Sequence, residues 1–235
     1  MMQFGVTSPP MFELTRDQEL FILTMRNGEN RFTLETLARL NEVLDEVQAQ
    51  AGDGAAALIV VGEGKYWSNG IDLDWLGKAD KSEAGHFVPT LNHFLGRVLS
   101  FPIPTVAALN GHAFAAGAML ALAMDFRLMR VDRGWFCLPE IDIHIPFHPA
   151  MLALIRSKLS GTTLRDATLL GKRYAASEAL AAAIADETCA NEDLLARAAE
   201  LARPVAQKGR AIYRQMKRDL YGDVADQLQS ELRLA

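Results

Sequence analysis

The chain has 235 residues, of which 50% are hydrophobic and 23% are charged. This composition is typical of a soluble globular enzyme or binding protein, and the length is ample for a buried core. With 24 basic and 29 acidic residues, the net charge of −5 argues against a surface that follows nucleic-acid phosphates.

The first third of the chain predicts two strands, a helix and a further strand. MFELTRDQ and LFILTM flank a polar turn, and AALIVV is expected to be a buried strand. Between them, residues 32–50 carry apolar side chains at helical spacing, and Thr33 is a suitable N-cap. The apolar face of this helix comprises Leu34, Leu37, Leu40, Val43, Leu44 and Val47.

A second unit repeats this order of elements. Residues 91–101 predict a helix, residues 104–110 a strand, and residues 115–125 another helix. FRLMR and WFCLPE then predict two short strands. The repeated order favours an α/β layered core with right-handed crossovers.

Helices without strands are expected from about Pro149 onward. MLALIRSKLSG predicts a helix that closes on Gly161, and residues 164–186 and 192–220 predict further helical segments. Helices that follow an α/β core in this way usually cover it or form an oligomer interface.

Cysteine usage and apolar runs bear on the compartment. Cys137 and Cys189 are far apart and lack CxxC spacing, so neither a disulfide framework nor a structural zinc site is indicated. No signal peptide is evident at the N-terminus, and the longest strongly apolar run, AFAAGAMLALAM, has 12 residues against the roughly 20 that span a bilayer. The C-terminal LRLA is not a peroxisomal tripeptide. We therefore expect a cytoplasmic location and no membrane partner.

Three common motifs fail around the loop that follows AALIVV. The third glycine of GxGxxG would fall on Trp67, and the first glycine of a P-loop would fall on Ile59. A GxSxG elbow around Ser68 needs glycine where Tyr66 stands. Dinucleotide binding, a P-loop and nucleophilic serine chemistry therefore have little support.

Two turns at strand ends offer backbone groups instead. In SNG, Gly70 allows a bend that points amide N–H groups outward at the end of a buried strand. After the second strand, NG leads to the small residues 115–117, which allow a ligand to approach the backbone where a helix begins. If each turn donates one N–H, the two turns form an oxyanion hole.

SNGIDL, PTVAALNGHAFAAGAMLALAMD and LPEIDI resemble, in order and spacing, the enoyl-CoA hydratase/isomerase (crotonase) superfamily. The resemblance covers essentially the whole chain. It implies an α/β, crotonase-like (ClpP/crotonase) spiral of repeated ββα units over residues 1–190, with a C-terminal helical cover or oligomerisation segment over 191–235. Family members are usually trimers or dimers of trimers, so a homotrimer or dimer of trimers is expected.

The resemblance also implies a site for an acyl-CoA thioester. The backbone N–H groups of Ser68 and Ala116 match the oxyanion-hole positions. Of the two glutamates of the hydratases, one matches Glu140 and the other falls on Met119. Because CoA is part of the substrate, no separate cofactor is implied. The expected substrate contacts are Asn69, Gly70, Ile71, Gly117 and Met119.

The departure at Met119 predicts the reaction. Hydration needs one group to activate water and another to protonate C2, and a thioether does neither. A single carboxylate suffices to take a proton from C2 and return it at C4, while two N–H groups hold the enolate. The predicted activity is therefore that of the one-glutamate Δ3,Δ2-enoyl-CoA isomerases, to which RFTLETLARLNEVL, KYWSNGIDL, NGHAFAAG and MRVDRG are also similar.

The predicted base must be desolvated to raise its pKa. WFCL, IDI and Met119 are expected to form an apolar wall around Glu140. Asp142 is the second candidate for acid/base work, because it would share the face of Glu140 if the strand continued. Its family counterpart is not catalytic in the hydratases. A hydratase or another acyl-CoA enzyme, and a catalytically silent acyl-CoA binder, are the alternatives.

Other polar residues near the predicted cleft are assigned structural roles. His112, His144 and His148 lack metal-ligand spacing, so no metal is expected, and His112 is expected to be a satisfied turn histidine. Asp72 and Asp125 are expected to cap backbone N–H groups.

CoA is expected to lie across RNGENR and the SNGIDL loop. Arg26, Arg31 and Lys65 are candidates for phosphate contacts. FHPAML departs from the glycine-rich stretch of the hydratases at this place, so the floor of the acyl pocket is not predicted.

Overall fold

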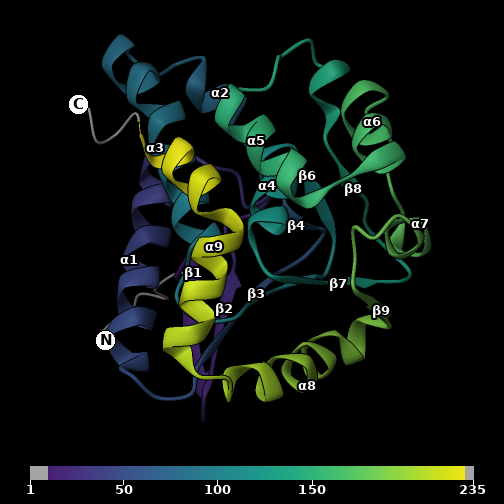
Figure 1. Cartoon of the computed structure of the whole chain (residues 1–235). Helices are drawn as coiled ribbons and strands as arrows, with labels where there is room; N and C mark the ends of the chain where they lie inside the picture. The colour runs from purple at the N-terminus through teal and green to yellow at the C-terminus, as the bar shows by residue number, and fades with distance from the viewer. Residues whose placement is uncertain (1–9, 231–235) are drawn as a thin grey trace, which may run out of the picture.

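The computed structural model describes residues 10–230, whose strands form two sheets (Figure 1). The larger sheet has the order β1-β2-β3-β5-β7-β9, and the smaller one β4-β6-β8. Only β1 and β2 pair antiparallel, and all other neighbouring strands are parallel.

The strands are β1 (Phe12–Asp17), β2 (Leu20–Met25), β3 (Ala57–Gly62), β4 (Tyr66–Ser68), β5 (Thr105–Leu109), β6 (His112–Phe114), β7 (Phe126–Arg130), β8 (Phe136–Cys137) and β9 (Glu187–Cys189). The α-helices are α1 (Leu34–Ala51), α2 (Leu73–Leu76), α3 (Lys81–Leu99), α4 (Ala116–Ala123), α5 (Pro149–Lys158), α6 (Gly161–Leu169), α7 (Ala176–Ala181), α8 (Leu194–Ala206) and α9 (Arg210–Gln229). Two 3-10 helices are η1 (Pro139–Ile141) and η2 (Asn191–Asp193).

Three successive strand pairs divide between the two sheets. β3, β5 and β7 enter the larger sheet, and β4, β6 and β8, which follow them directly, form the smaller one. Helices follow each pair: α2 and α3 the first, α4 the second, and η1 and α5 the third. The expected repetition of ββα units is confirmed. Because β4 and β6 pair in parallel, the turns that follow them lie at the same edge of the smaller sheet.

The first long helix forms as predicted. The Thr33 side chain accepts a hydrogen bond from the N–H of Thr36, whose own side chain accepts one from the N–H of Thr33. Leu37, Leu40 and Leu44 are fully buried against the sheet side of the core, as their helical spacing predicts.

The helix expected from residue 91 begins ten residues earlier, at Lys81. Asp80 accepts hydrogen bonds from the N–H groups of Ser82 and Glu83, and the Glu83 carboxylate accepts one from the N–H of Asp80. This capping box is the sequence pattern that marks the start of the helix. It was missed because Gly85 and Pro89 interrupt the apolar pattern of the first turns.

The expectation that strands end before Pro149 was wrong. β9 adds to the edge of the larger sheet by pairing in parallel with β7. Its three residues are all half-buried, so no alternation of apolar and polar side chains marks it.

Glycines divide the predicted C-terminal helices differently. Gly161 begins α6 and does not close α5. Gly171, with a φ of 55°, lies between α6 and α7, and Gly209 separates α8 from α9. Residues 164–186 and 192–220 are therefore each interrupted. The predicted division at residue 190 stays a prediction, and residues 231–235 lie outside the described range.

The last two helices cover different parts of the core (Figure 1). α8 buries Leu194, Ala198, Ala202 and Ala206 against the larger sheet. α9 runs alongside α3 and approaches it so closely that a Cβ on Gly96 would lie 2.9 Å from the Cβ of Leu228. Small residues at both contacts allow this close packing.

A buried ion pair joins α9 to the core beneath it. Lys217 is 4% exposed, and its Nζ lies 2.9 Å from a carboxylate oxygen of Asp125. Asp125 also accepts hydrogen bonds from the N–H and hydroxyl of Thr105. The structural role predicted for Asp125 is confirmed. In residues 10–230, no helix has the length and apolar character needed to cross a membrane.

Candidate active site

The turn after β4 and the start of α4 lie in backbone contact. A Cβ on Gly117 would lie 2.5 Å from the carbonyl oxygen of Ser68, and one on Gly70 would lie 3.1 Å from the backbone nitrogen of Ala116. Real Cβ atoms are not found at 2.5 Å, so glycine is required at position 117. Gly70 has in addition a φ of 78°, which favours glycine. These two glycines allow the turn after β4 and the start of α4, which carry the two predicted amide donors, to lie in contact.

The backbone of α4 begins in a strained conformation. Ala115, the N-cap, has φ 50° and ψ −124° and provides no side-chain cap. Ala116 is the first helical residue, and N–H groups of a first helical turn have no acceptor within their own helix. Strain of this kind persists where the surroundings hold the backbone, and it is typical of functional sites.

The side chain of Ser68 has a structural partner. Its hydroxyl donates a hydrogen bond of 2.7 Å to the carbonyl oxygen of Asn30 and is 3.3 Å from the N–H of Gly70. Ser68 is fully buried. This engagement agrees with the prediction that its hydroxyl is not a nucleophile.

A cavity of about 260 Å³ opens beside these turns. Of the predicted site residues, Asn69, Ile71 and Glu140 line it. The others are not among its lining residues: Ser68, Gly70, Ala116, Gly117 and Met119. Met119 is 2% exposed and packs in the hydrophobic core. The cavity is lined by Arg31, Asn69, Ile71, Leu73, Phe114, Ala115, Pro139, Glu140, Ile143 and Ile145.

Glu140 is the buried carboxyl of this cavity. It is 6% exposed, and its Oε2 is buried without a hydrogen-bond partner among the described residues. Burial away from water raises the pKa of Glu140 to about 7. A carboxyl group in this state can both accept and return a proton near neutral pH.

The segment that carries Glu140 is a 3-10 turn and not the predicted strand end. Pro139 begins the turn, and its carbonyl oxygen accepts hydrogen bonds from the N–H groups of Asp142 and Ile143. Proline favours the first position of such a turn because its φ is already fixed. Ile143 of the IDI segment lines the cavity and supplies part of the expected apolar wall, and Ile145, two residues further on, adds to it.

The alternative assignment to Asp142 was wrong in its geometry. Because the chain turns, Asp142 does not share the face of Glu140, and it is exposed. A Cβ on Gly171 would lie 2.8 Å from its Oδ2, which places the Asp142 carboxylate beside the loop that follows α6.

A second cavity, of about 760 Å³, adjoins the first. Glu140 and Ile145 line both, so the carboxyl group lies where the two meet. Sequence analysis missed this cavity, although Leu164, Thr168 and Leu169 repeat at helical spacing along α6. The larger cavity is lined by Glu140, Ile141, His144, Ile145, Pro146, Phe147, Leu152, Gly161, Leu164, Arg165, Thr168 and Leu169.

The three predicted phosphate-binding cations differ in their surroundings. Arg31 lines the smaller cavity and forms an ion pair of 2.7 Å with Glu29. Arg26 forms ion pairs with Glu13 and Glu63. The Nζ of Lys65 lies 5.3 Å from the centre of the Tyr66 ring.

Two further predictions concern polar residues beside the site. Asp72 accepts a hydrogen bond from the N–H of Trp75 and caps α2, which confirms its predicted role. His112 was wrongly expected to be a satisfied turn residue. It lies on β6 among the rings of Tyr66, Phe114 and Trp135, and its Nδ1 is buried without a hydrogen-bond partner in residues 10–230.

The sequence resembles a large set of known proteins along most of its length. The family model described as enoyl-CoA hydratase/isomerase matches residues 15–235. The chain is 34% identical over 228 residues to enoyl-CoA delta isomerase 3 of Arabidopsis thaliana. The aligned region covers 91% of this chain and 93% of that protein. The chain is 33% identical to the peroxisomal enoyl-CoA delta isomerase 2 of the same plant, covering 95% and 98%.

Solved structures share the architecture. A Mycobacterium tuberculosis enoyl-CoA isomerase in apo form superposes with a TM-score of 0.85 at 26% identity, covering 94% of this chain and 95% of that one. A structure of a probable enoyl-CoA hydratase from the same organism superposes with a TM-score of 0.86 at 26% identity, covering 94% and 92%.

Proposed function

The chain belongs to the enoyl-CoA hydratase/isomerase family, and from this premise we propose that it is a Δ3,Δ2-enoyl-CoA isomerase, which moves the C3 double bond of an acyl-CoA to C2. One observation carries the proposal. Glu140 is a single buried carboxyl group at the junction of two cavities, and the position of the second family glutamate is occupied by Met119 in the core. The printed names of the Arabidopsis relatives support the same activity.

The proposed reaction is a proton transfer within one substrate. The thioester carbonyl oxygen accepts hydrogen bonds from the N–H groups of Ser68 and Ala116. The Glu140 carboxylate removes a proton from C2, and the electron pair of that bond moves to the carbonyl oxygen to give a dienolate. Glu140 then returns the proton at C4, so the double bond lies between C2 and C3 and no atom is gained or lost.

The two N–H groups supply most of the stabilisation. The thioester α-proton is a weak acid, so the negative charge on oxygen must be held by donors that are already in place. One such donor is worth about 3–4 kcal/mol in known oxyanion holes. The contact between Gly117 and Ser68 fixes the spacing of the two turns that carry the donors.

We propose the rest of the complex from the family. CoA lies across residues 26–31 and the 68–73 loop, with Arg31 at the cavity wall as the nearest of the three candidate cations. The proposed assembly is a homotrimer or dimer of trimers, to be tested by light scattering. The proposed location is the cytoplasm, to be tested by imaging a tagged full chain, since two relatives from Arabidopsis are named peroxisomal.

The direct test is a comparison of two substrates. We expect the conjugated-thioester absorbance to rise with a 3-enoyl-CoA and to stay constant with a 2-enoyl-CoA. A fall with the second substrate would show that water is added and would contradict the isomerase assignment. Binding of acyl-CoA without any turnover, unchanged in Glu140→Gln, would show a silent binder.

A further inference from the structure

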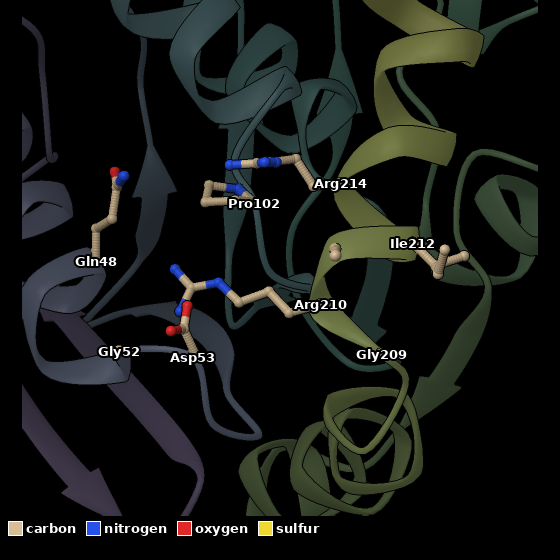
Figure 2. A pocket seen from close by; sticks show the side chains of 9 residues that line it. Gln48, Gly52, Asp53, Pro102, Gly209, Arg210, Ile212 and Arg214 are labelled. Carbon is tan, nitrogen blue, oxygen red and sulfur yellow. The ribbon is translucent and has the colours of Figure 1, made fainter.

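A further cleft, distinct from the two cavities at Glu140, lies at the opposite end of the larger sheet. Its volume is about 650 Å³, within the range of small-molecule sites. It is formed by the end of α1, the turn before β5 and the start of α9 (Figure 2). Gly52 and Pro102 precede the parallel strands β3 and β5, whereas the active-site turns follow β4 and β6. The cleft shares no lining residue with the two cavities at Glu140, so it is separate from the catalytic site.

Two arginines extend from α9 into this cleft (Figure 2). Arg210 and Arg214 are one helical turn apart, and neither forms an ion pair with any residue of the range 10–230. The Nη1 of Arg210 is buried and has no hydrogen-bond partner there. A buried donor without an acceptor is unfavourable, and an oxyanion in the cleft would satisfy it.

The start of α9 adds to this positive charge. The N-cap is Gly209, which offers no side-chain oxygen, and the first turn contains no acidic residue. The N–H groups of the first turn of this 20-residue helix therefore lack a capping acceptor, and an arginine stands where the helix dipole favours an anion. The N–H groups and the positive dipole end at the beginning of α9 are therefore available to an anion.

We propose that this cleft binds a phosphate-bearing anion. Arginine guanidinium groups match phosphate oxygens in pairs of parallel hydrogen bonds, and free N–H groups at a helix start bind the same oxygens. The Gln48 side chain lies on the opposite wall as a further donor. Asp53 lines the same cleft and forms no ion pair with another described residue, and its negative charge lowers the positive charge that the anion meets.

The first experiment measures binding by isothermal titration calorimetry on the full chain at low chloride concentration. The probes are inorganic pyrophosphate and adenosine 3′,5′-bisphosphate. We expect saturable binding of at least one of them. Similar affinities would identify the phosphates as the recognised group, and preference for the bisphosphate would identify a nucleotide source. No saturable binding of either probe at millimolar concentration would overturn the proposal.

Variants assign the binding to the cleft. Arg210→Gln with Arg214→Gln should weaken binding at least tenfold, because charge-assisted hydrogen bonds are lost. Arg218→Gln, two turns from Arg210 on the same helix and outside the cleft, is the matched control and should leave the affinity unchanged. Asp53→Asn should tighten binding. Unchanged binding in the double variant would overturn the assignment.

A substitution at the start of α9 provides a test that does not rely on the loss of an arginine charge. A Cβ on Gly209 would meet no atom within 4 Å, so an aspartate fits there. Gly209→Asp should cap α9, raise the melting temperature by about 2–4 °C and abolish anion binding, because its carboxylate takes the same N–H groups. Isomerase turnover should stay within twofold of wild type in all these variants. Anion binding that survives in Gly209→Asp would contradict the site.

Discussion

The carbonyl oxygen of Ser68 occupies the space that a side chain on residue 117 would need. A Cβ on Gly117 would lie 2.5 Å from that oxygen and 2.7 Å from the Ser68 hydroxyl oxygen. The two residues belong to different ββα units, so this contact sets the distance between the turn after β4 and the helix α4. The spacing of the two proposed oxyanion donors therefore depends on the absence of one methyl group.

Gly117→Ala should separate the two turns. We expect a loss of about 100- to 1000-fold in kcat for a 3-enoyl-CoA, the loss that follows removal of one oxyanion donor. Gly85→Ala on α3 is the control, because a Cβ there meets no atom within 4 Å. The control should gain about 0.5–1 kcal/mol of stability and keep full activity. Equal activity of the two variants would exclude the proposed role of the contact.

Ala115→Gly should stabilise the protein. At φ 50° an alanine side chain is strained, at a cost of order 1–3 kcal/mol, and glycine loses about 0.5–1 kcal/mol more backbone entropy on folding. We expect a net gain of roughly 1 kcal/mol in the free energy of unfolding, measured by urea denaturation. The control is Ala118→Gly within the same helix, which should lose at least about 1 kcal/mol. If both variants lose stability alike, Ala115 is not strained.

Glu140→Gln should remove the acid/base group and keep its shape. Positioned acid/base catalysis contributes about 100- to 10,000-fold, so kcat should fall within that range while acyl-CoA affinity changes little. Asp142→Asn is the matched control, since Asp142 is exposed two residues away. It should keep kcat within about twofold. A larger effect at Asp142 than at Glu140 would reverse the assignment.

The pKa of Glu140 links activity and stability to pH. With a pKa raised to about 7 by burial, kcat/KM should rise with pH and level off above about pH 7. Between about pH 4.5 and 7 the folded state holds a proton that the unfolded state releases, so stability should fall as pH rises through this window. The loss by pH 8 is up to about 3 kcal/mol. Glu140→Gln should remove this fall in urea denaturation, and an identical pH dependence in wild type and variant would contradict it.

Features with a local signal were predictable from the sequence. The strands β1, β2, β3, β5 and β7, the Thr33 cap and the glycines of the two turns depend on neighbouring residues, and the structure has them as expected. The prediction that Glu140 belongs to the same site as those turns came from the resemblance to the family. The raised pKa of Glu140 follows from its apolar surroundings.

Features that depend on distant residues were not predictable. β9 is a strand only because β7 offers an open edge, and its three residues carry no pattern of their own. The larger cavity forms where α6 meets the segment after Glu140, and the helical spacing within α6 does not indicate which segment that helix faces. Asp142 was misplaced because one proline converted an expected strand into a turn.

The pairing of Asp125 with Lys217 has a consequence for how the protein is made. The two residues are 92 positions apart, and the lysine lies on α9, which the ribosome synthesises after the strands of both sheets. A nascent chain that lacks α9 holds a carboxylate placed for burial without its partner, and breaking such a pair costs about 3–5 kcal/mol. Because whole domains are stable by only about 5–15 kcal/mol, prematurely terminated chains should be recognised as unfolded and degraded. The native state thus becomes stable only after α9 has been synthesised.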